Sequence, residues 1–427
     1  MGWWTLAVLV GLSAVSYVDR QIISLMVGPI RSDLNVSDFQ ISLLQGIAFA
    51  LFFAAFGLPL GWLVDRAQRR LVIFGGVVVW SLATAASGLA TSFGHLFIAR
   101  LMVGAGEAAL APAAYSMIAD LFPKRRLAFA LSIFNIGGAT GSALAVFLGG
   151  VLITGLSQVS ITATGSVPLA TWQLAFISVG LPGLVLAFMI FLIPEPSRSQ
   201  SGPKTSAADM AELWAFVKTR RTFLAFHFLG FGCMSALGYA AMNWLPAYLM
   251  RRFGVPVAEA GALVGVIIVC SIPGGLLASA LVDRLFARGR TDAHLFLYVF
   301  IALGLTILGP IAFLADSLPA FVALMAGVMF LAAAPGTATA ALQIATPPRL
   351  RGRVSAMYLF VYQMVGLGTG PSVVAAFTDY VFKDDALVGY SMAATIAIFG
   401  LAAALLFALG RGPMRRAIRA LAEEEAS

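Results

Sequence analysis

The chain has 427 residues, of which 60% are hydrophobic and 11% charged, and its formal net charge is +8. Soluble domains carry about 25% charged residues, and a fold of this size could not bury so much apolar surface. The composition therefore excludes a water-soluble protein and predicts an integral membrane protein. The two cysteines, Cys233 and Cys270, lie in apolar segments without metal or redox spacing, which indicates packing residues.

Apolar windows recur along the whole chain. A membrane-spanning helix needs about 20 predominantly apolar residues, and twelve windows qualify: 4–30, 39–64, 71–91, 95–121, 127–154, 172–194, 222–250, 257–282, 293–315, 319–345, 353–381 and 386–410. No basic n-region or cleavage site accompanies the first window, so we expect it to stay in the membrane.

The longest polar interruption, 195–221, divides these windows six and six, and its ADMAELWAFVK stretch predicts a surface helix. We expect an all-α membrane protein with two six-helix bundles. The predicted parts are an N-terminal bundle (1–194), a cytoplasmic linker (195–221), a C-terminal bundle (222–411) and a cytoplasmic tail (412–427).

Four ionisable residues lie well inside the windows, all in the first half: Asp19, Arg20, Arg100 and Glu107. A charge at mid-bilayer costs at least ~2.5–3.5 kcal/mol, so such residues face a cavity or a partner. At 1.5 Å per residue, Asp19 and Glu107 lie at similar depth, roughly 21 Å from the inner ends of their helices. Arg100 shares the helix face of Glu107, roughly 10 Å nearer the outside.

This placement predicts a proton switch. We expect Arg100 to pair with Asp19, so that making and breaking the pair ties proton uptake to a conformational change, with Glu107 as a second proton site. The alternative is a permanent buried salt bridge that fixes the two helices together. Arg20 points about 100° away from Asp19 on the helix, and we expect it to hold a lipid phosphate, a substrate anion or a backbone carbonyl.

Two polar loops of the first half reappear in the second. GWLVDRAQRR (61–70) matches SALVDRLFARGR (279–290), and PKRRLAFALSIF (123–134) matches RLRGRVSAMYLF (349–360). Their offsets of 218 and 227 residues are nearly equal, which indicates a duplicated six-helix unit. The repeated loops have charged residues at matching places: Asp65, Arg66 and Arg126 in the first half, and Asp283, Arg284 and Arg353 in the second.

The basic residues are unevenly distributed between the two sides. With the N-terminus inside, 21 of the 27 Lys and Arg residues fall in inside loops and the tail. This is the positive-inside pattern of membrane proteins, so we expect both termini in the cytoplasm. The positive charge is then an orientation signal, which excludes a nucleic-acid partner.

The G-x-L-x-D-R-x-x-R-R element at 61–70 resembles the signature of the major facilitator superfamily, with Gln68 and Ser279 as departures from it. The resemblance implies the fold with twelve transmembrane helices, and it implies that Asp65 latches the inner gate by facing a helix N-terminus. It also implies a gating role for the other charged residues of the repeated loops: Arg66, Arg126, Asp283, Arg284 and Arg353. The alternative is that Asp65 and Arg66 are solvated loop charges.

Residues 100–145 contain R-x-x-x-G-x-G-E-A, I-A-D-L-F and L-S-I-F, and together with the DR of the first window they look like the spinster branch of that superfamily. Eukaryotic members of the branch are associated with export of sphingosine-1-phosphate and lysophospholipids. The anion/cation symporter branch also has the DR and a GEA-like element, but it lacks the other two.

The second half contains no ionisable residue at mid-membrane, which predicts an apolar counterpart to the charged first half and an amphipathic substrate. The predicted substrate-binding residues are Arg20, Tyr115, Asn135, Asn243, Tyr358 and Gln363. The chain has no HExxH, GxSxG, Cys/His cluster or GxxxxGK[ST], so we expect no enzyme activity, metal or cofactor.

The sequence thus predicts a proton-coupled secondary transporter of an amphipathic, lipid-like small molecule, monomeric, in a bacterial cytoplasmic membrane. The alternative is an organic-anion/cation symporter of the same superfamily.

Overall fold

The computed structural model describes residues 2–158, 169–197, 207–332 and 335–426. These residues form helices and no β-strand. The chain divides into two compact units: unit 1 comprises Met1–Gly202 and Met242–Val269, and unit 2 comprises Pro203–Ala241 and Cys270–Ser427. The predicted boundaries of the two six-helix bundles stay a prediction.

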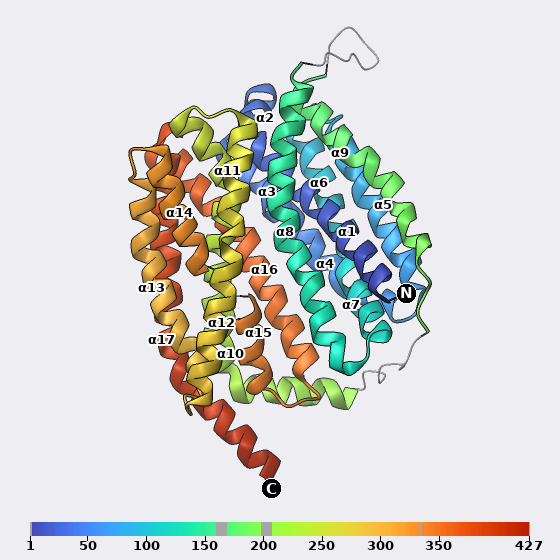
Figure 1. Cartoon of the computed structure of the whole chain (residues 1–427), viewed down its shortest axis with the longest axis vertical. Helices are drawn as coiled ribbons and strands as arrows, with labels where there is room; N and C mark the ends of the chain where they lie inside the picture. The colour runs from blue at the N-terminus through green and yellow to red at the C-terminus, as the bar shows by residue number, and fades with distance from the viewer. Residues whose placement is uncertain (1, 159–168, 198–206, 333–334, 427) are drawn as a thin grey trace. The chain divides into compact units, whose positions relative to one another are not determined.

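Unit 1 contains most of the first half of the chain (Figure 1). Its helices are α1 Gly2–Gln21, α2 Val27–Leu34, α3 Asp38–Gln45, α4 Ile47–Val64, α5 Arg69–Ser87, α6 Phe93–Glu107, α7 Leu110–Leu121, α8 Lys124–Leu156, α9 Thr171–Ala187 and α11 Val257–Val269. In this unit α8 contacts α1 and α11, α5 contacts α6 and α9, and α4 contacts α6.

Unit 2 contains α12 Ser271–Ala287, α13 Ala293–Phe313, α14 Leu318–Ala332, α15 Pro335–Ile344, α16 Arg351–Ala376 and α17 Val388–Ala426. In it α13 contacts α14 and α17, and α12 contacts α14. Helix α10, Ala207–Phe253, contributes its first part to unit 2 and its last part, from Met242, to unit 1. Its beginning includes the surface helix predicted in the linker, whereas 198–206 lie outside the described residues.

Short turns of tighter or wider helix interrupt several spans. The 3-10 turns are Ile22–Leu25, Phe188–Leu192 and Asp385–Leu387, and Phe377–Phe382 is a π-helical turn. Eleven stretches of the described chain are long and apolar enough to cross a membrane, and a shorter apolar stretch, Thr140–Leu156, falls in the remaining window. The twelve predicted spans are confirmed.

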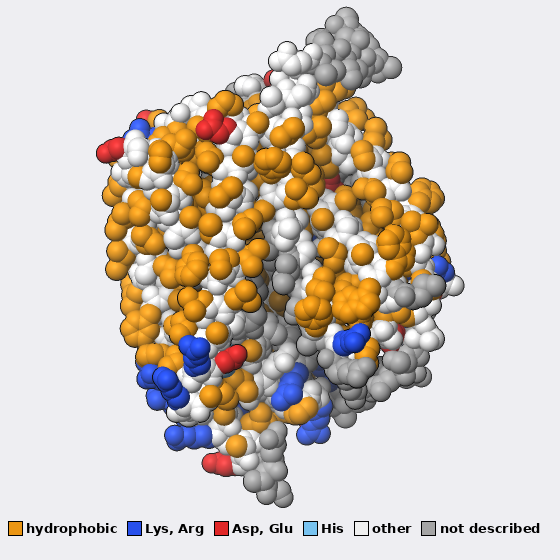
Figure 2. Space-filling view, viewed as in Figure 1, with side chains coloured by type: hydrophobic (Ala, Val, Ile, Leu, Met, Phe, Trp, Pro, Cys, Tyr) orange, Lys and Arg blue, Asp and Glu red, His pale blue; other side chains and the backbone are white. Residues whose placement is uncertain are grey.

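Large apolar side chains cover the outside of these helices. Val185 on α9 is 72% exposed and Leu276 on α12 is 68% exposed. In unit 2, Figure 2 shows hydrophobic side chains over the length of the helices and Lys and Arg side chains gathered at the end that bears the α12 and α17 termini. An apolar belt with charge at its end is the surface of a multi-pass membrane protein.

Candidate functional site

Three broken helices of unit 1 bring the charged residues together. Helix α1 ends at Gln21, α3 and α4 are separated at Gly46, and α6 ends at Glu107 before α7 begins. Turn-type backbone hydrogen bonds replace the regular helical pattern at two of these breaks, from the N–H of Met26 to the carbonyl of Ile23 and from the N–H of Ala109 to the carbonyl of Gly106. Discontinuous helices of this kind form ion and substrate sites in transporters.

Glu107 forms an ion pair with Arg20. Both Nε and Nη2 of Arg20 lie 2.5 Å from Glu107 Oε2, which also accepts a 2.7 Å hydrogen bond from the Ser16 hydroxyl. The Glu107 side chain is fully buried, and its Oε1 has no hydrogen-bond partner among the described residues. Arg20 and Ser16 reach the same carboxylate because residues four apart share a helix face.

Arg100 contacts the backbone of α1 rather than a carboxylate. Its Nη1 donates to the carbonyl of Asp19 at 3.1 Å, and its Nε donates to the carbonyl of Leu44 at 3.4 Å. The predicted Asp19–Arg100 ion pair is therefore not formed in this state. The physical reason is that the last carbonyl groups of a helix lack intrahelical donors, and α1 ends two residues after Asp19.

Asp19 is 1% exposed, and its Oδ1 has no hydrogen-bond partner within the described part of the chain. The adjacent Arg20 contacts Glu107 instead, so these two neighbouring charges differ in their contacts. The structure thus agrees with the predicted separation of Asp19 and Arg20. The partner of Arg20, a carboxylate, was not among those that the sequence suggested.

Arg20 is the least buried of these four charges, with a side chain that is 16% exposed. Its guanidinium carbon lies 4.5 Å from the ring centre of Phe49, 5.2 Å from Tyr17 and 5.5 Å from Phe53. Aromatic faces attract a guanidinium group, so these rings hold the cation while Glu107 neutralises it.

The glycines before Glu107 let α6 approach its neighbours. A Cβ atom on Gly104 would lie 2.3 Å from the carbonyl oxygen of Phe49 on α4, and one on Gly106 would lie 2.7 Å from the carbonyl oxygen of Gly76 on α5. No side chain fits at either position. The G-x-G-E spacing therefore places Glu107 where two other helices meet α6.

The other substrate residues predicted in unit 1 differ in their local surroundings. Tyr115 on α7 is 38% exposed, and its ring packs edge-on against Phe134 at 5.4 Å. Asn243 is 3% exposed, and its carbonyl accepts a hydrogen bond from Gln45 Nε2 at 3.4 Å. Asn135 lies within α8, but its side chain is outside the described residues.

Two predicted substrate residues belong to unit 2, both on α16. Tyr358 is 1% exposed, its ring lies 5.3 Å from that of His227, and its hydroxyl has no hydrogen-bond partner among the described residues. Gln363 Oε1 accepts a 2.9 Å hydrogen bond from the Tyr239 hydroxyl. Both are polar groups at buried or half-buried positions of α16.

The predicted gating residues lie at helix ends. Asp65 is the C-terminal capping residue of α4, and the Arg66 guanidinium covers the Trp62 ring at 3.7 Å. Arg126 is exposed in the first turn of α8. In unit 2, Asp283 and Arg284 are exposed near the end of α12, and Arg353 is half-buried at the start of α16.

A buried ionic cluster near the end of α4 and the start of α5 was not predicted from the sequence. Arg69 forms ion pairs with Asp120 and, through Nε at 2.8 Å, with Glu195. Glu195 also accepts the backbone N–H groups of Arg69 and Arg70, at 3.3 and 3.0 Å. A carboxylate at a helix N-terminus is stabilised by the helix dipole. Asp120 is the acidic residue of the I-A-D-L-F element. An acidic residue at the end of a predicted helix was the sequence signal that could have located this cluster.

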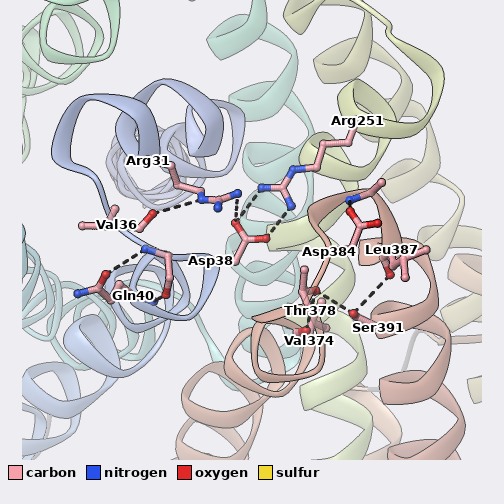
Figure 3. A network of polar contacts seen from close by, with 12 residues as sticks. Arg31, Val36, Asp38, Gln40, Arg251, Val374, Thr378, Asp384, Leu387 and Ser391 are labelled. Atoms are coloured by element: carbon pink, nitrogen blue, oxygen red, sulfur yellow. Dashed lines mark hydrogen bonds and ion pairs between the residues drawn. The ribbon is translucent and has the colours of Figure 1, made fainter. Parts of the chain in front are cut away.

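A second missed cluster lies at the opposite end of unit 1 (Figure 3). Asp38, the first residue of α3, is fully buried and pairs with Arg31 at 3.1 Å and with Arg251 at 2.6 Å. Ser37 and Gln40 form a capping box that starts the helix at Asp38. Ser37-x-x-Gln40 in the sequence was the signal that could have located this residue.

Within either unit, no three His, Cys, Asp or Glu side chains of the described residues bring their ligand atoms close together. Four carboxylates of unit 1 instead form ion pairs with arginines: Asp38, Glu107, Asp120 and Glu195.

A family model described as "Major Facilitator Superfamily" matches residues 9–371. An MFS-type efflux pump of Mycolicibacterium smegmatis is 28% identical, over 97% of this chain and 94% of its own. Protein spinster homolog 3 of Danio rerio is 30% identical over 57% of this chain, which spans 47% of that relative. A probable galactarate/D-glucarate transporter of Bacillus subtilis is 25% identical, over 68% of this chain and 66% of its own.

Among solved structures, a bacterial homologue of the human lysosomal transporter Spinster, in an inward-facing and unoccupied conformation, superimposes with a TM-score of 0.74. It is 25% identical, with 98% of this chain and 97% of that chain covered. The predicted resemblance to the spinster branch is confirmed by this neighbour and by the zebrafish relative.

These relatives are transporters, so the chain is a secondary transporter rather than an enzyme, as the sequence predicted. The matched region covers most of the twelve spans, and the all-α fold agrees with that of the solved neighbour. The chain therefore belongs to the Major Facilitator Superfamily.

Proposed function

We propose that the chain is a proton-coupled transporter that moves an amphipathic, lipid-like small molecule by alternating access. The observation that carries the proposal is the ion pair of Arg20 with the buried Glu107, next to a buried Asp19 whose Oδ1 has no hydrogen-bond partner among the described residues. An ionised carboxylate away from water must be paired, or it takes up a proton. The group can therefore exchange a proton for an ion pair.

The coupling step involves a competition for Arg20. In the described state Glu107 holds Arg20, whose partial exposure leaves it the most accessible charge of the group. An anionic head group that binds Arg20 displaces Glu107, and the freed carboxylate takes a proton. Asp19, with an unpartnered Oδ1, is the second proton carrier. Arg100 positions the end of α1 through its two carbonyl contacts.

The substrate class follows from the chemistry of the two units. Unit 1 offers a guanidinium surrounded by the rings of Tyr17, Phe49 and Phe53. Unit 2 offers Tyr358 and Gln363 among apolar side chains, and Tyr115, Asn135 and Asn243 complete the proposed substrate-binding set. An anionic head group suits the guanidinium of unit 1, and a hydrocarbon tail suits the rings around Tyr358 in unit 2.

The repeated loop motifs are proposed to form the inner gate. Six charged residues of these loops would close the inner side in the outward-facing state. They are Asp65, Arg66 and Arg126 and their counterparts Asp283, Arg284 and Arg353. We also propose that both termini lie in the cytoplasm of a bacterial cell, in line with the positive-inside distribution of the basic residues. The transporter is further proposed to act as a monomer.

Flux in proteoliposomes tests the coupling. A labelled lysophospholipid is offered with and without an imposed pH gradient, to the natural protein, to Asp19→Asn and to Glu107→Gln. We expect gradient-driven accumulation that both variants lose. Glu259→Gln, which neutralises an exposed carboxylate in the first turn of α11, is the matched control and should keep it. Flux of equal size with and without the gradient would refute proton coupling.

A second candidate is a symporter of small organic anions. It is favoured by Arg20, which could grip a carboxylate, and by the relatives named as galactarate/D-glucarate and hexuronate transporters. Competition experiments distinguish the two candidates. Small dicarboxylic sugar acids inhibit flux if the chain is an anion symporter, and lysophospholipids inhibit flux if it is a lipid transporter.

A further inference from the structure

A basic pocket lies at the end of unit 2 and contains none of the residues proposed for substrate binding or proton coupling. Its volume is about 560 Å³, and it lies between the α12–α13 turn and the last turns of α17. Four arginines line it, Arg288, Arg290, Arg415 and Arg419, together with Thr291 and Asp292. Four guanidinium groups face one carboxylate, so the pocket carries a net positive charge.

The α12–α13 turn has a defined conformation. Gly289 has φ +86°, and its N–H donates to the carbonyl of Phe286, while the N–H of Arg290 donates to the carbonyl of Leu285. This pattern of hydrogen bonds ends a helix with a left-handed glycine. The turn holds Arg288 and Arg290 on either side of Gly289, and all three residues line the pocket.

The single carboxylate of the pocket is already neutralised. Asp292 is 2% exposed and pairs with Arg411 at 2.7 Å and with Arg290 at 3.5 Å. Both guanidinium groups also lie over the Phe296 ring, at 4.9 and 3.6 Å from its centre. Arg290 is therefore fixed in place by Asp292 and Phe296.

Three arginines of the pocket remain available. Arg288, Arg415 and Arg419 are exposed, and no described carboxylate lies within ion-pair distance of them. Guanidinium groups bind phosphate oxygens in a forked geometry, often with two hydrogen bonds to one group. A cluster of this kind is a site for a phosphate ester.

Apolar surface adjoins the pocket along the same helices. Leu409 and Leu405 on α17 are 51% and 58% exposed, and Leu281 on α12 is 37% exposed. Leu409 precedes Arg415 by six residues, roughly 9 Å along the helix. A ligand with a phosphate head at the arginines could therefore lay hydrocarbon chains over these leucines, whereas free phosphate would use none of this surface.

We propose that this pocket binds the phosphodiester head group of an anionic phospholipid, separately from the transported substrate. Basic pockets between helices at the cytoplasmic side of a membrane bind such head groups. The assignment to the inner leaflet depends on the proposed topology, but the binding itself depends neither on the substrate nor on proton coupling.

Lipid binding to the purified full-length protein tests the proposal. Phosphatidylglycerol or phosphatidylcholine with the same acyl chains is added in detergent, and bound lipid is measured by native mass spectrometry, with the melting temperature as a second readout. We expect phosphatidylglycerol to bind preferentially. Arg415→Gln combined with Arg419→Gln should weaken its binding by about 30-fold, because each arginine contributes about 1 kcal/mol and 1.4 kcal/mol is tenfold.

The control removes two exposed charges of unit 2 that do not line the pocket, by Arg416→Gln combined with Lys218→Gln. This variant should bind phosphatidylglycerol as the natural protein does. Arg288→Gln provides the same test if the double pocket variant does not fold. Equal loss in control and pocket variants would overturn the proposal.

Inorganic phosphate and glycerol phosphate distinguish a soluble anion from a lipid. If either one, at millimolar concentration, raises the melting temperature as much as phosphatidylglycerol and competes with it, the pocket is a soluble-anion site and the lipid assignment is wrong. Transport is not measured in any of these arms, so their failure leaves the proposed transport function unaffected.

Discussion

Arg251 holds Asp38 with both terminal nitrogens, Nη1 to Oδ2 at 2.6 Å and Nη2 to Oδ1 at 2.8 Å, although 213 residues separate them in sequence (Figure 3). Two parallel hydrogen bonds between a guanidinium and a carboxylate form a specific and strong pair. Through it the last turn of α10 is joined to the start of α3 within unit 1.

We expect Arg251→Gln to destabilise the protein by about 3 kcal/mol, because removing one partner leaves the buried carboxylate of Asp38 with Arg31 alone. Arg251→Lys keeps the charge but not the fork, and it should fall between this variant and the natural protein. Melting temperatures measured by thermal unfolding in detergent give the order of stability of the three proteins. Identical melting temperatures for Lys and Gln would mean that the paired charge does not contribute to stability.

Gly104 and Gly57 make a matched pair of helix glycines. Gly104→Ala places a methyl group 2.3 Å from the Phe49 carbonyl oxygen, and we expect a loss of about 1–3 kcal/mol. A Cβ atom on Gly57 meets nothing within 4 Å, so Gly57→Ala should be neutral or stabilising by up to ~1 kcal/mol. Melting temperatures of the two variants check the contrast, and equal values would contradict close contact between α4 and α6.

Glu195 gives the stability a defined dependence on pH. Burial raises the pKa of Glu195, but hydrogen bonds from the Arg69 side chain and the Arg70 backbone outweigh it, so the pKa lies below its ordinary value of 4.5. A depressed pKa in the folded state adds stability above pH 4.5, and this stability is lost as the pH falls through the folded-state pKa.

We therefore expect Glu195→Gln to lower the melting temperature at pH 7 and to flatten its decline in the acid range. The exposed Glu259→Gln serves as the control and should follow the natural protein at every pH. If the melting curves of Glu195→Gln and the natural protein kept a constant separation down to pH 3, the ionised carboxylate would not be the stabilising group.

The Tyr358→Phe variant distinguishes a structural role of the Tyr358 hydroxyl from a substrate-binding role. Its buried hydroxyl has no hydrogen-bond partner among the described residues, so Tyr358→Phe should leave the melting temperature unchanged or raise it. If that hydroxyl contacts the substrate, the same variant should raise the KM of transport severalfold with little change in maximal rate. An unchanged KM would remove Tyr358 from the proposed substrate-binding set.

The spans and their repeat could be predicted because hydropathy and loop charge are properties of single segments. The pairing of Arg20 with Glu107 could not, because it depends on the rotation of α1 and α6 about their axes. The depth estimate put Asp19 and Glu107 at one level, but depth alone does not say which of two arginines faces a carboxylate. Arg100 was within reach of Asp19, and it contacts the backbone of that residue instead.

Asp38 and Glu195 escaped prediction for a different reason. Each lies at the edge of a span, where an acidic residue in the sequence looks like an ordinary loop charge. Their function as partners of Arg251 and Arg69 arises only when segments 213 and 126 residues apart are folded together. The Ser37-x-x-Gln40 capping box marks the start of α3, but nothing in it identifies a distant guanidinium.

The ion pair between Arg20 and Glu107 also bears on how the protein is made. Arg20 leaves the ribosome 87 residues before its partner, which at 5–20 residues per second is roughly 4 to 17 s. During that interval the first span carries both Asp19 and Arg20 without the carboxylate that later neutralises the arginine. Until the fourth span has been synthesised, the first span therefore carries the cost of a charged Arg20 that Glu107 does not yet neutralise.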